Sequence, residues 1–124
     1  MSDLLDGLRI LIVEDEFLAA LEMQGMIEQR GGSVAGPVGR LEQAMNIVGS
    51  ETLDAGVLDV ALDSLTSYPI ADELARQGVP VIFVTGYAGG MLPDRFAAAP
   101  KLSKPVTRKA LETALCAVLP ALQQ

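Results

Sequence analysis

The sequence predicts an α/β fold in which a parallel sheet is covered by helices on both faces. Short apolar runs alternate with amphipathic stretches five times along the 124 residues, a pattern typical of repeated strand–helix units. Polar residues also follow the apolar runs, as expected where ligands bind beyond the carboxyl ends of parallel strands. Together these two observations favour a doubly wound sheet.

Each element is expected where the hydrophobic period and the turn residues place it. The strands are expected at Arg9 to Val13, Ser33 to Val38, Ala55 to Val60, Val81 to Val84 and Lys101 to Ser103. The helices are expected from Phe17 to the stop at Gly31-Gly32, around Leu41 to Val48, from about Ile70 to Gln77, and from the N-cap Thr107 to Leu119. Because Gly89, Gly90 and Pro93 interrupt Ala88 to Ala99, the fourth of the five expected helices should be short or mobile.

Length and composition indicate one domain. Residues 1–124, with a core from about 9 to 119, are too few for two domains of ordinary size. No apolar stretch approaches the roughly 20 residues of a membrane span, and the acidic N-terminus lacks the features of a signal peptide. We therefore expect a cytoplasmic protein with no membrane contact. The single cysteine, Cys116, excludes an internal disulfide.

Charge excludes several classes of function. Sixteen acidic residues against nine basic ones give a net charge of −7, so nucleic acid is not an expected ligand. The chain has no histidine, which excludes a histidine-based catalytic triad and a histidine-containing zinc site. Any phosphohistidine that serves this protein must lie on another molecule.

The polar residues that follow the strands are expected to meet at one edge of the sheet. Glu14 and Asp15 follow the first apolar run, Asp59 ends the third, and Thr85 and Lys104 follow the fourth and fifth. Converging carboxylates repel one another, and a divalent cation relieves that repulsion. Because all the ligands are oxygens, Mg²⁺ is favoured over zinc or copper.

This set of residues can carry out phosphoryl transfer. Asp59 is then a carboxylate nucleophile, while Thr85 supplies a hydroxyl donor and Lys104 a compact cation. Gly86 leaves space beside the incoming group. Phosphoryl transfer needs alignment and charge neutralisation more than covalent help from the protein.

Each residue also has a purely structural interpretation. Asp59 could cap a turn, Thr85-Gly86 could be an ordinary strand exit, and Lys104-Pro105 could belong to a loop. Glu16 fits better as a negative charge at a helix N-terminus, and Asp63 fits an exposed turn. The joint arrangement at successive strand ends favours the functional interpretation.

The same residues resemble the signature of bacterial two-component response-regulator receiver domains. The resemblance rests on the segments Ile10 to Glu16, Val57 to Val60, Val84 to Gly86 and Lys104-Pro105, and it extends from about Arg9 to Leu119. It implies a flavodoxin-like sheet with strand order 2-1-3-4-5. It also implies that Asp59 is the phosphoacceptor, that Glu14 and Asp15 form an acidic pocket, and that Thr85 and Lys104 contact the phosphoryl group. Mg²⁺ would be held by Asp15, Asp59 and the carbonyl of Ala61.

Two positions depart from the family pattern. Members usually carry Tyr or Phe three residues before the strand-five lysine, where this chain has Lys101, so the common Thr-to-aromatic switch cannot operate in its usual form. Val106 stands where Phe is frequent. The segment Pro80 to Tyr87 instead resembles the "FAT GUY" receivers, a subfamily associated with histidine kinases of the HWE type.

The resemblance also bears on partners and output. We expect a histidine kinase or histidine phosphotransfer protein as phosphodonor, and output through an unidentified downstream protein or a role as phosphate sink or relay. No output domain is expected within the chain. The segment Ala88 to Pro100 is the expected switch, and Tyr87 either shields the acyl phosphate from water or packs against that segment.

Two other classes of function remain open at this point. One is a receiver fold that acts as a phosphorylation-independent interaction module, although the intact set of Asp59, Thr85 and Lys104 argues against it. The other is a phosphatase similar to haloacid dehalogenases, which would need a second Asp at the position of Ala61. We therefore expect a self-phosphorylating receiver that does not turn over external substrates.

Overall fold

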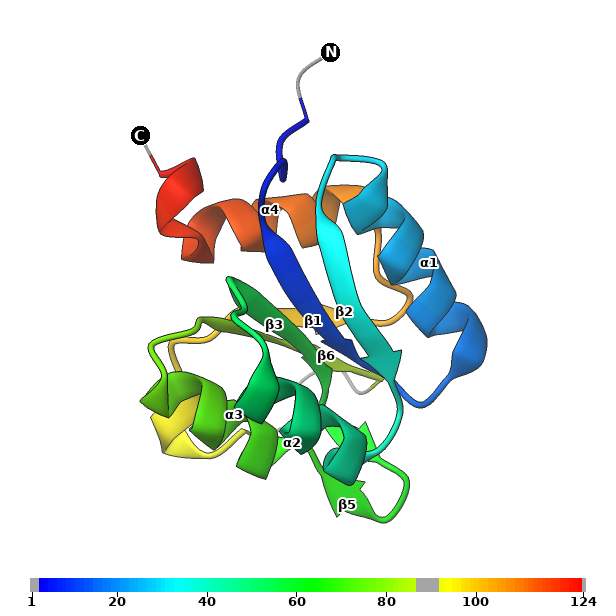
Figure 1. Ribbon diagram of the computed structural model, residues 1–124. Coiled ribbons are helices and arrows are strands. Elements are labelled where there is room, and N and C mark those ends of the chain that lie inside the picture. Colours follow the sequence, from blue (N-terminus) through cyan, green and yellow to red (C-terminus); the bar gives the residue numbers. More distant parts are fainter. Residues whose placement is uncertain (1–2, 87–91, 124) are drawn as a thin grey trace.

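A five-stranded parallel sheet forms the centre of the computed structural model, which describes residues 3–86 and 92–123 (Figure 1). Its strands are β1 (Arg9–Val13), β2 (Ser33–Val38), β3 (Ala55–Asp59), β6 (Val81–Thr85) and β7 (Lys101–Ser103). They lie in the order β2-β1-β3-β6-β7, and every neighbouring pair is parallel. Counted within this sheet alone, the order is 2-1-3-4-5. The predicted doubly wound, flavodoxin-like fold is confirmed.

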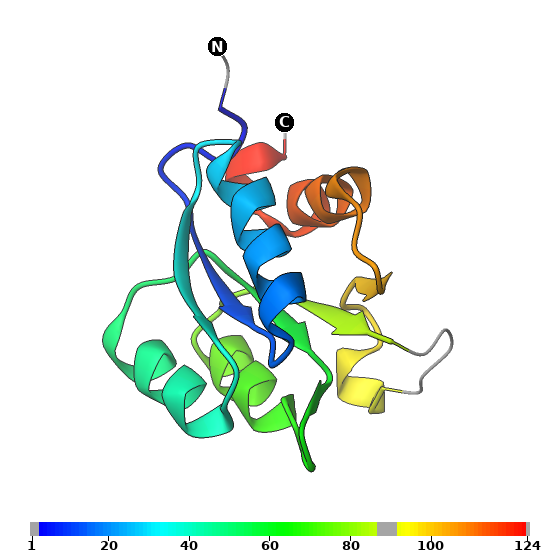
Figure 2. The same ribbon diagram turned by 90° about the vertical axis from the view of Figure 1, so that its right-hand side faces the viewer.

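Two helical layers cover the sheet. Figures 1 and 2 show α1 (Phe17–Glu28) and α4 (Arg108–Val118) on one face, and α2 (Leu41–Ser50) and α3 (Tyr68–Arg76) on the other. Successive residues of one strand therefore serve different layers, because side chains alternate across a sheet. On β1, Ile10 and Ile12 pack in the α1/α4 core, whereas Leu11 and Val13 pack in the α2/α3 core.

Single residues determine where α4 begins and how closely α3 packs on the sheet. The side chain of Thr107 accepts a hydrogen bond of 3.1 Å from the backbone N–H of Ala110, so its predicted role as the N-cap of α4 is confirmed. On β3, a Cβ at Gly56 would lie 2.7 Å from a methyl carbon of Leu74. The missing side chain therefore allows α3 to pack closely on the strand.

The connection after β3 contains a small hairpin that the sequence did not predict. It consists of β4 (Ala61–Leu62) and β5 (Leu65–Thr66), paired antiparallel. Asp63 at its tip has φ = 57°, a left-handed conformation that Asp tolerates better than most residues. The hairpin lies beyond the carboxyl end of β3 and therefore beside the predicted site.

The remaining elements are single turns of 3₁₀-helix. Between β6 and β7, the described residues 92–100 contain η1 (Asp94–Phe96), where the sequence predicted a short fourth helix. A second turn, η2 (Pro120–Leu122), follows α4. No helix among the described residues is long and apolar enough to cross a membrane.

Candidate functional site

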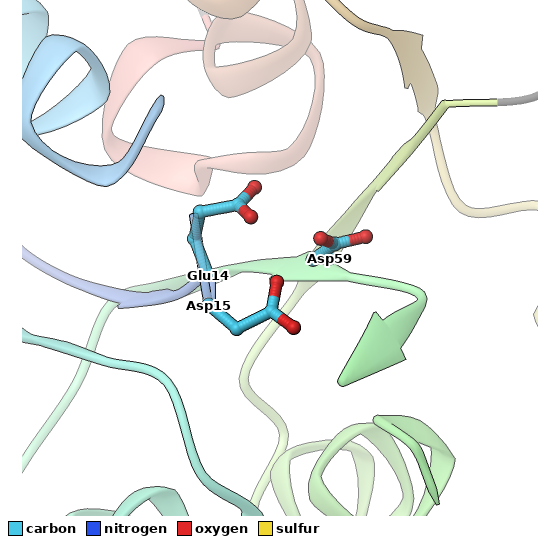
Figure 3. Close-up of side chains that lie close together, drawn as sticks. All are labelled: Glu14, Asp15 and Asp59. Carbon is cyan, nitrogen blue, oxygen red and sulfur yellow. The ribbon is translucent and has the colours of Figure 1, made fainter. Parts of the chain in front are cut away.

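Three carboxylates converge at the carboxyl edge of the sheet, as predicted. Glu14 and Asp15 directly follow β1, and Asp59 is the last residue of β3, the strand beside it. Figure 3 shows the Glu14 and Asp15 side chains leaving the chain in different directions, with both carboxylates beside Asp59. One oxygen from each of the three residues lies within 4.8 Å of the others.

Lys104 joins this cluster from the far edge of the sheet. Its backbone N–H donates a hydrogen bond of 3.0 Å to the carbonyl of Thr85, the last residue of β6, which fixes the loop after β7 beside the site. Its ammonium group donates to Asp59 Oδ2 at 2.8 Å and to Glu14 Oε2 at 3.1 Å. Lys104 therefore contacts both Glu14 and Asp59, the expected phosphoacceptor, directly.

Burial makes this cluster electrostatically unusual. The Glu14 side chain is fully buried and that of Asp59 is 7% exposed. The pKa of the Glu14 carboxyl is raised to about 7, mainly by burial. Hydrogen bonding and charge repulsion from Asp59 contribute to this rise, whereas the Glu16 N–H and Lys104 oppose it. Partial burial lowers the pKa of Lys104, but its hydrogen bonds to Asp59, Glu16 and Glu14 outweigh that effect and hold the pKa above its ordinary value.

Backbone N–H groups of the hairpin region orient the carboxylates. The N–H of Ala61 donates to Asp59 Oδ1 at 3.3 Å. The N–H of Asp63 donates to Asp15 Oδ2 at 3.1 Å. Asp63 is exposed at the tip of the hairpin, as its predicted turn position requires, but its backbone also contacts the site.

Glu16 belongs to the site, although the sequence favoured a purely local role for it. It occupies the N-cap position of α1, yet its side chain makes no capping hydrogen bond. Its carboxylate instead accepts a hydrogen bond of 2.7 Å from Lys104, and its backbone N–H donates to Glu14 Oε2 at 3.0 Å. The local sequence carries no signal for this contact, because Lys104 lies 88 residues away in the chain.

The residues after β6 complete the described edge. Thr85 is half-buried, and Gly86 beside it is exposed. A Cβ built on Gly86 would meet no described atom within 4 Å. Tyr87 and residues 88–91 of the predicted switch segment lie outside the described residues.

The residues fit a hard divalent cation. The cluster of Glu14, Asp15 and Asp59 offers only oxygen ligands, the type that Mg²⁺ prefers. Lys104 Nζ lies 3.1 Å from Glu14 Oε1 but directs its hydrogen bond to Oε2, and the buried Oε1 accepts no hydrogen bond from the described residues. A buried, unsatisfied carboxylate oxygen is costly, and a cation or an ordered water ligand would satisfy it.

Comparison with known proteins agrees with the fold. Residues 10–116 match the family model of the response regulator receiver domain. A comparison with curated protein sequences found no significant match.

Solved structures are also similar over nearly the whole chain. SdrG from Sphingomonas melonis Fr1 is 35% identical to this chain, with a TM-score of 0.81. The match covers 95% of this chain and 98% of the SdrG chain. The BeF₃-activated conformation of SdrG, from Pseudomonas melonis Fr1, is 34% identical to this chain, with a TM-score of 0.77. This match covers 93% of this chain and 96% of the SdrG chain. A third similar structure is the receiver domain of the sensor histidine kinase PA1611 from Pseudomonas aeruginosa PAO1, which has a magnesium ion coordinated in its active site cleft. It is 26% identical to this chain, with a TM-score of 0.75. The match covers 90% of this chain and 97% of the PA1611 receiver domain.

Proposed function

The chain belongs to the response regulator receiver domain family, and on this premise we propose that it accepts a phosphoryl group on Asp59 with the help of Mg²⁺. The phosphodonor is a histidine kinase or a histidine phosphotransfer protein. One observation carries the proposal: Asp59 Oδ2 lies 2.8 Å from Lys104 Nζ, within a cluster of carboxylates suited to a divalent cation.

The transfer step needs little from this chain beyond the nucleophile. A carboxylate oxygen of Asp59 attacks the phosphorus atom, the P–O bond forms, and the P–N bond to the partner's imidazole breaks. When the other ring nitrogen of that imidazole carries a proton, the ring leaves as a neutral group. No base from this chain is then required, which agrees with its lack of histidine.

The remaining residues neutralise and orient the phosphoryl group. Mg²⁺ would be held by Asp15, Asp59 and the carbonyl of Ala61, with Glu14 beside it, and when bound it would neutralise phosphoryl oxygens. Lys104 supplies a cation from the side of β7, and Thr85 supplies a hydroxyl at the end of β6. The open position of Gly86 leaves room for the incoming group, and Tyr87 tunes the access of water to it.

The proposal extends to the pathway in which the protein acts. The proposed donor is a histidine kinase, of the HWE type if the Pro80 to Tyr87 segment marks the subfamily, and the protein itself acts in the cytoplasm. Output passes through a protein partner, or the protein serves as a phosphate sink or relay. Asp59 thus carries a phosphoryl group that the chain passes on or loses by hydrolysis, and no external substrate is turned over.

Intact mass spectrometry with Mg²⁺ and acetyl phosphate tests the acceptor. We expect a single phosphoryl adduct on the wild-type chain and on Asp63→Asn, a matched control that removes an exposed carboxylate beside the site. Asp59→Asn should carry no adduct. An adduct that persists on Asp59→Asn would identify a different acceptor. If neither acetyl phosphate nor candidate kinases label the wild type, and it binds no Mg²⁺, the interaction-module alternative is favoured.

A further inference from the structure

The ammonium group of Lys104 uses all of its hydrogen-bond donors within the described site. A lysine ammonium has three N–H groups, and Lys104 donates to Glu14, Glu16 and Asp59. The bond to Glu16 is 2.7 Å long, the shortest of the three. A phosphoryl oxygen can therefore receive a hydrogen bond from Lys104 only if one of these carboxylates gives up its own.

The three partners differ in how readily water can replace Lys104. The Glu14 side chain is 0% exposed, so it would be left as a buried carboxylate without its cation. The Asp59 side chain is 7% exposed, and after one of its oxygens bonds to phosphorus, the other is a neutral carbonyl oxygen that still accepts a hydrogen bond from Lys104. The Glu16 side chain is 64% exposed, and water solvates its carboxylate at little cost after the ion pair opens. Glu16 is therefore the partner that Lys104 can release.

We infer that Glu16 is a positioning residue that holds Lys104 in the unphosphorylated state and competes with the phosphoryl group for it. The inference rests on the proposed function. In this arrangement the Lys104–Glu16 bond opens when the phosphoryl group binds at Asp59. Glu16 thereby weakens the binding of the phosphoryl group and shortens its lifetime on the protein.

The surroundings allow this contact to be removed without disturbing the fold. The Glu16 side chain makes no capping hydrogen bond to α1, and the bond to Glu14 comes from the Glu16 backbone, which a substitution preserves. A pocket of about 340 Å³ borders Glu16 and Lys104 and is lined on α1 by Ala19, Glu22 and Met23. Glu22 is also exposed but is not among the carboxylates that pair with Lys104, so it provides a matched control.

Removing the Glu16 charge should change two affinities in opposite directions. At saturating Mg²⁺, Glu16→Gln should bind beryllofluoride, a mimic of the phosphoryl group, about two- to fivefold more tightly, the range expected for an exposed ion pair. Glu16→Ala should show the larger gain, because a Gln amide oxygen can still accept from Lys104. Mg²⁺ alone should bind more weakly to both variants, because a negative charge near the cation is lost. A merely structural role would weaken both ligands.

NMR titrations with Mg²⁺ and then with beryllofluoride test the inference on wild type, Glu16→Gln, Glu16→Ala and Glu22→Gln. Tighter beryllofluoride binding by the Glu16 variants alone, with slower loss of the phosphoryl group after labelling, is the expected result. Unchanged or weaker binding by the Glu16 variants, or an equal gain in Glu22→Gln, would overturn the role of Glu16 while leaving Asp59 as acceptor. If the wild type itself binds no beryllofluoride with Mg²⁺, the proposed function fails and the inference fails with it.

Discussion

The carboxyl edge of the sheet has a buried half and an exposed half that differ in their electrostatics. In the buried half, Glu14 and Asp59 have little access to water, and both contact the ammonium group of the half-buried Lys104. In the exposed half, Asp15, Glu16 and Asp63 are reached by solvent. Both halves contain carboxylates, and both are tied to the same sheet edge.

The difference between the halves determines what each can contribute. A buried charge is stable only with its partner in place, so removing one member of the buried half should affect the stability of the whole domain. An exposed charge can exchange its partner for water at little cost. The buried half therefore holds Asp59 in position, whereas the exposed half can rearrange when a ligand arrives.

The largest expected effect follows from removing the positive charge of Lys104, the partner of two buried carboxylates. Lys104→Met keeps much of the apolar stem but leaves Glu14 and Asp59 without a counter-charge. At pH 8 without Mg²⁺, the free energy of unfolding should fall by about 4 kcal/mol, the cost of breaking a buried ion pair. Urea denaturation measures it, with Lys109→Met, at an exposed lysine of α4, as the control. A Lys104→Met variant as stable as this control would show that the stability of the buried half does not depend on the charge of Lys104.

A smaller effect is expected from pH, through Glu14. Its pKa rises from the ordinary 4.5 to about 7 in the folded chain, so the folded state binds more protons than the unfolded state between these values. The resulting contribution to stability is complete below pH 4.5 and is lost as pH rises through 7. The loss should be on the order of 3 kcal/mol.

Comparison with Glu14→Gln isolates this contribution. The variant cannot titrate at this position, so its free energy of unfolding relative to wild type should increase between pH 5 and pH 8 in the absence of Mg²⁺. Chemical denaturation at several pH values measures that difference. A difference independent of pH would mean that Glu14 is ionised in the folded chain throughout this range, and would remove the electrostatic distinction between the two halves.

The buried half of the site could be predicted from the sequence, because its residues occupy the ends of strands. Apolar runs place β1 and β3, and parallel pairing then brings Glu14 and Asp59 together without any knowledge of side-chain conformation. The predicted positions of Lys104 and Thr85 follow in the same way, and the structure places both at the same edge. The chemical roles of these residues remain proposals.

The exposed half could not be predicted, because it depends on local backbone geometry and on long side chains. The β4–β5 hairpin has only two residues in each strand, too few to give a hydrophobic period. Its contact with Asp15 depends on the N–H of Asp63 rather than on a side chain. Glu16 has several rotatable bonds, and only the folded chain shows that its carboxylate meets Lys104.

Around β6, too, one feature could be inferred from the sequence and another could not. The sequence indicates that Lys101 replaces the aromatic residue of the usual switch, and in the structure Lys101 is exposed and donates to the carbonyls of Ala97 and Ala99. The sequence did not predict that Tyr68, Phe83 and Phe96 would pack together, with ring centroids 5.1 to 6.3 Å apart. These rings come from α3, β6 and η1, so only the tertiary fold brings them together. The subfamily assignment remains a prediction.

The smallest effect on stability is expected in the exposed half, at Asp15. Asp15→Asn keeps an oxygen that can accept from the Asp63 N–H, and the carboxylate it removes is exposed to solvent. Without Mg²⁺, its free energy of unfolding should stay within about 0.5 kcal/mol of wild type.

With Mg²⁺, the wild type should gain stability as the cation binds the folded state, whereas Asp15→Asn should gain much less because it has lost a charged ligand. Thermal denaturation with EDTA and then with increasing Mg²⁺ measures both quantities, and Glu22→Gln provides the control. If Asp15→Asn gained as much from Mg²⁺ as the wild type, the cation would be bound by the buried half alone. A large loss of stability in EDTA would instead show that Asp15 supports the hairpin, so that the exposed half also has a structural role.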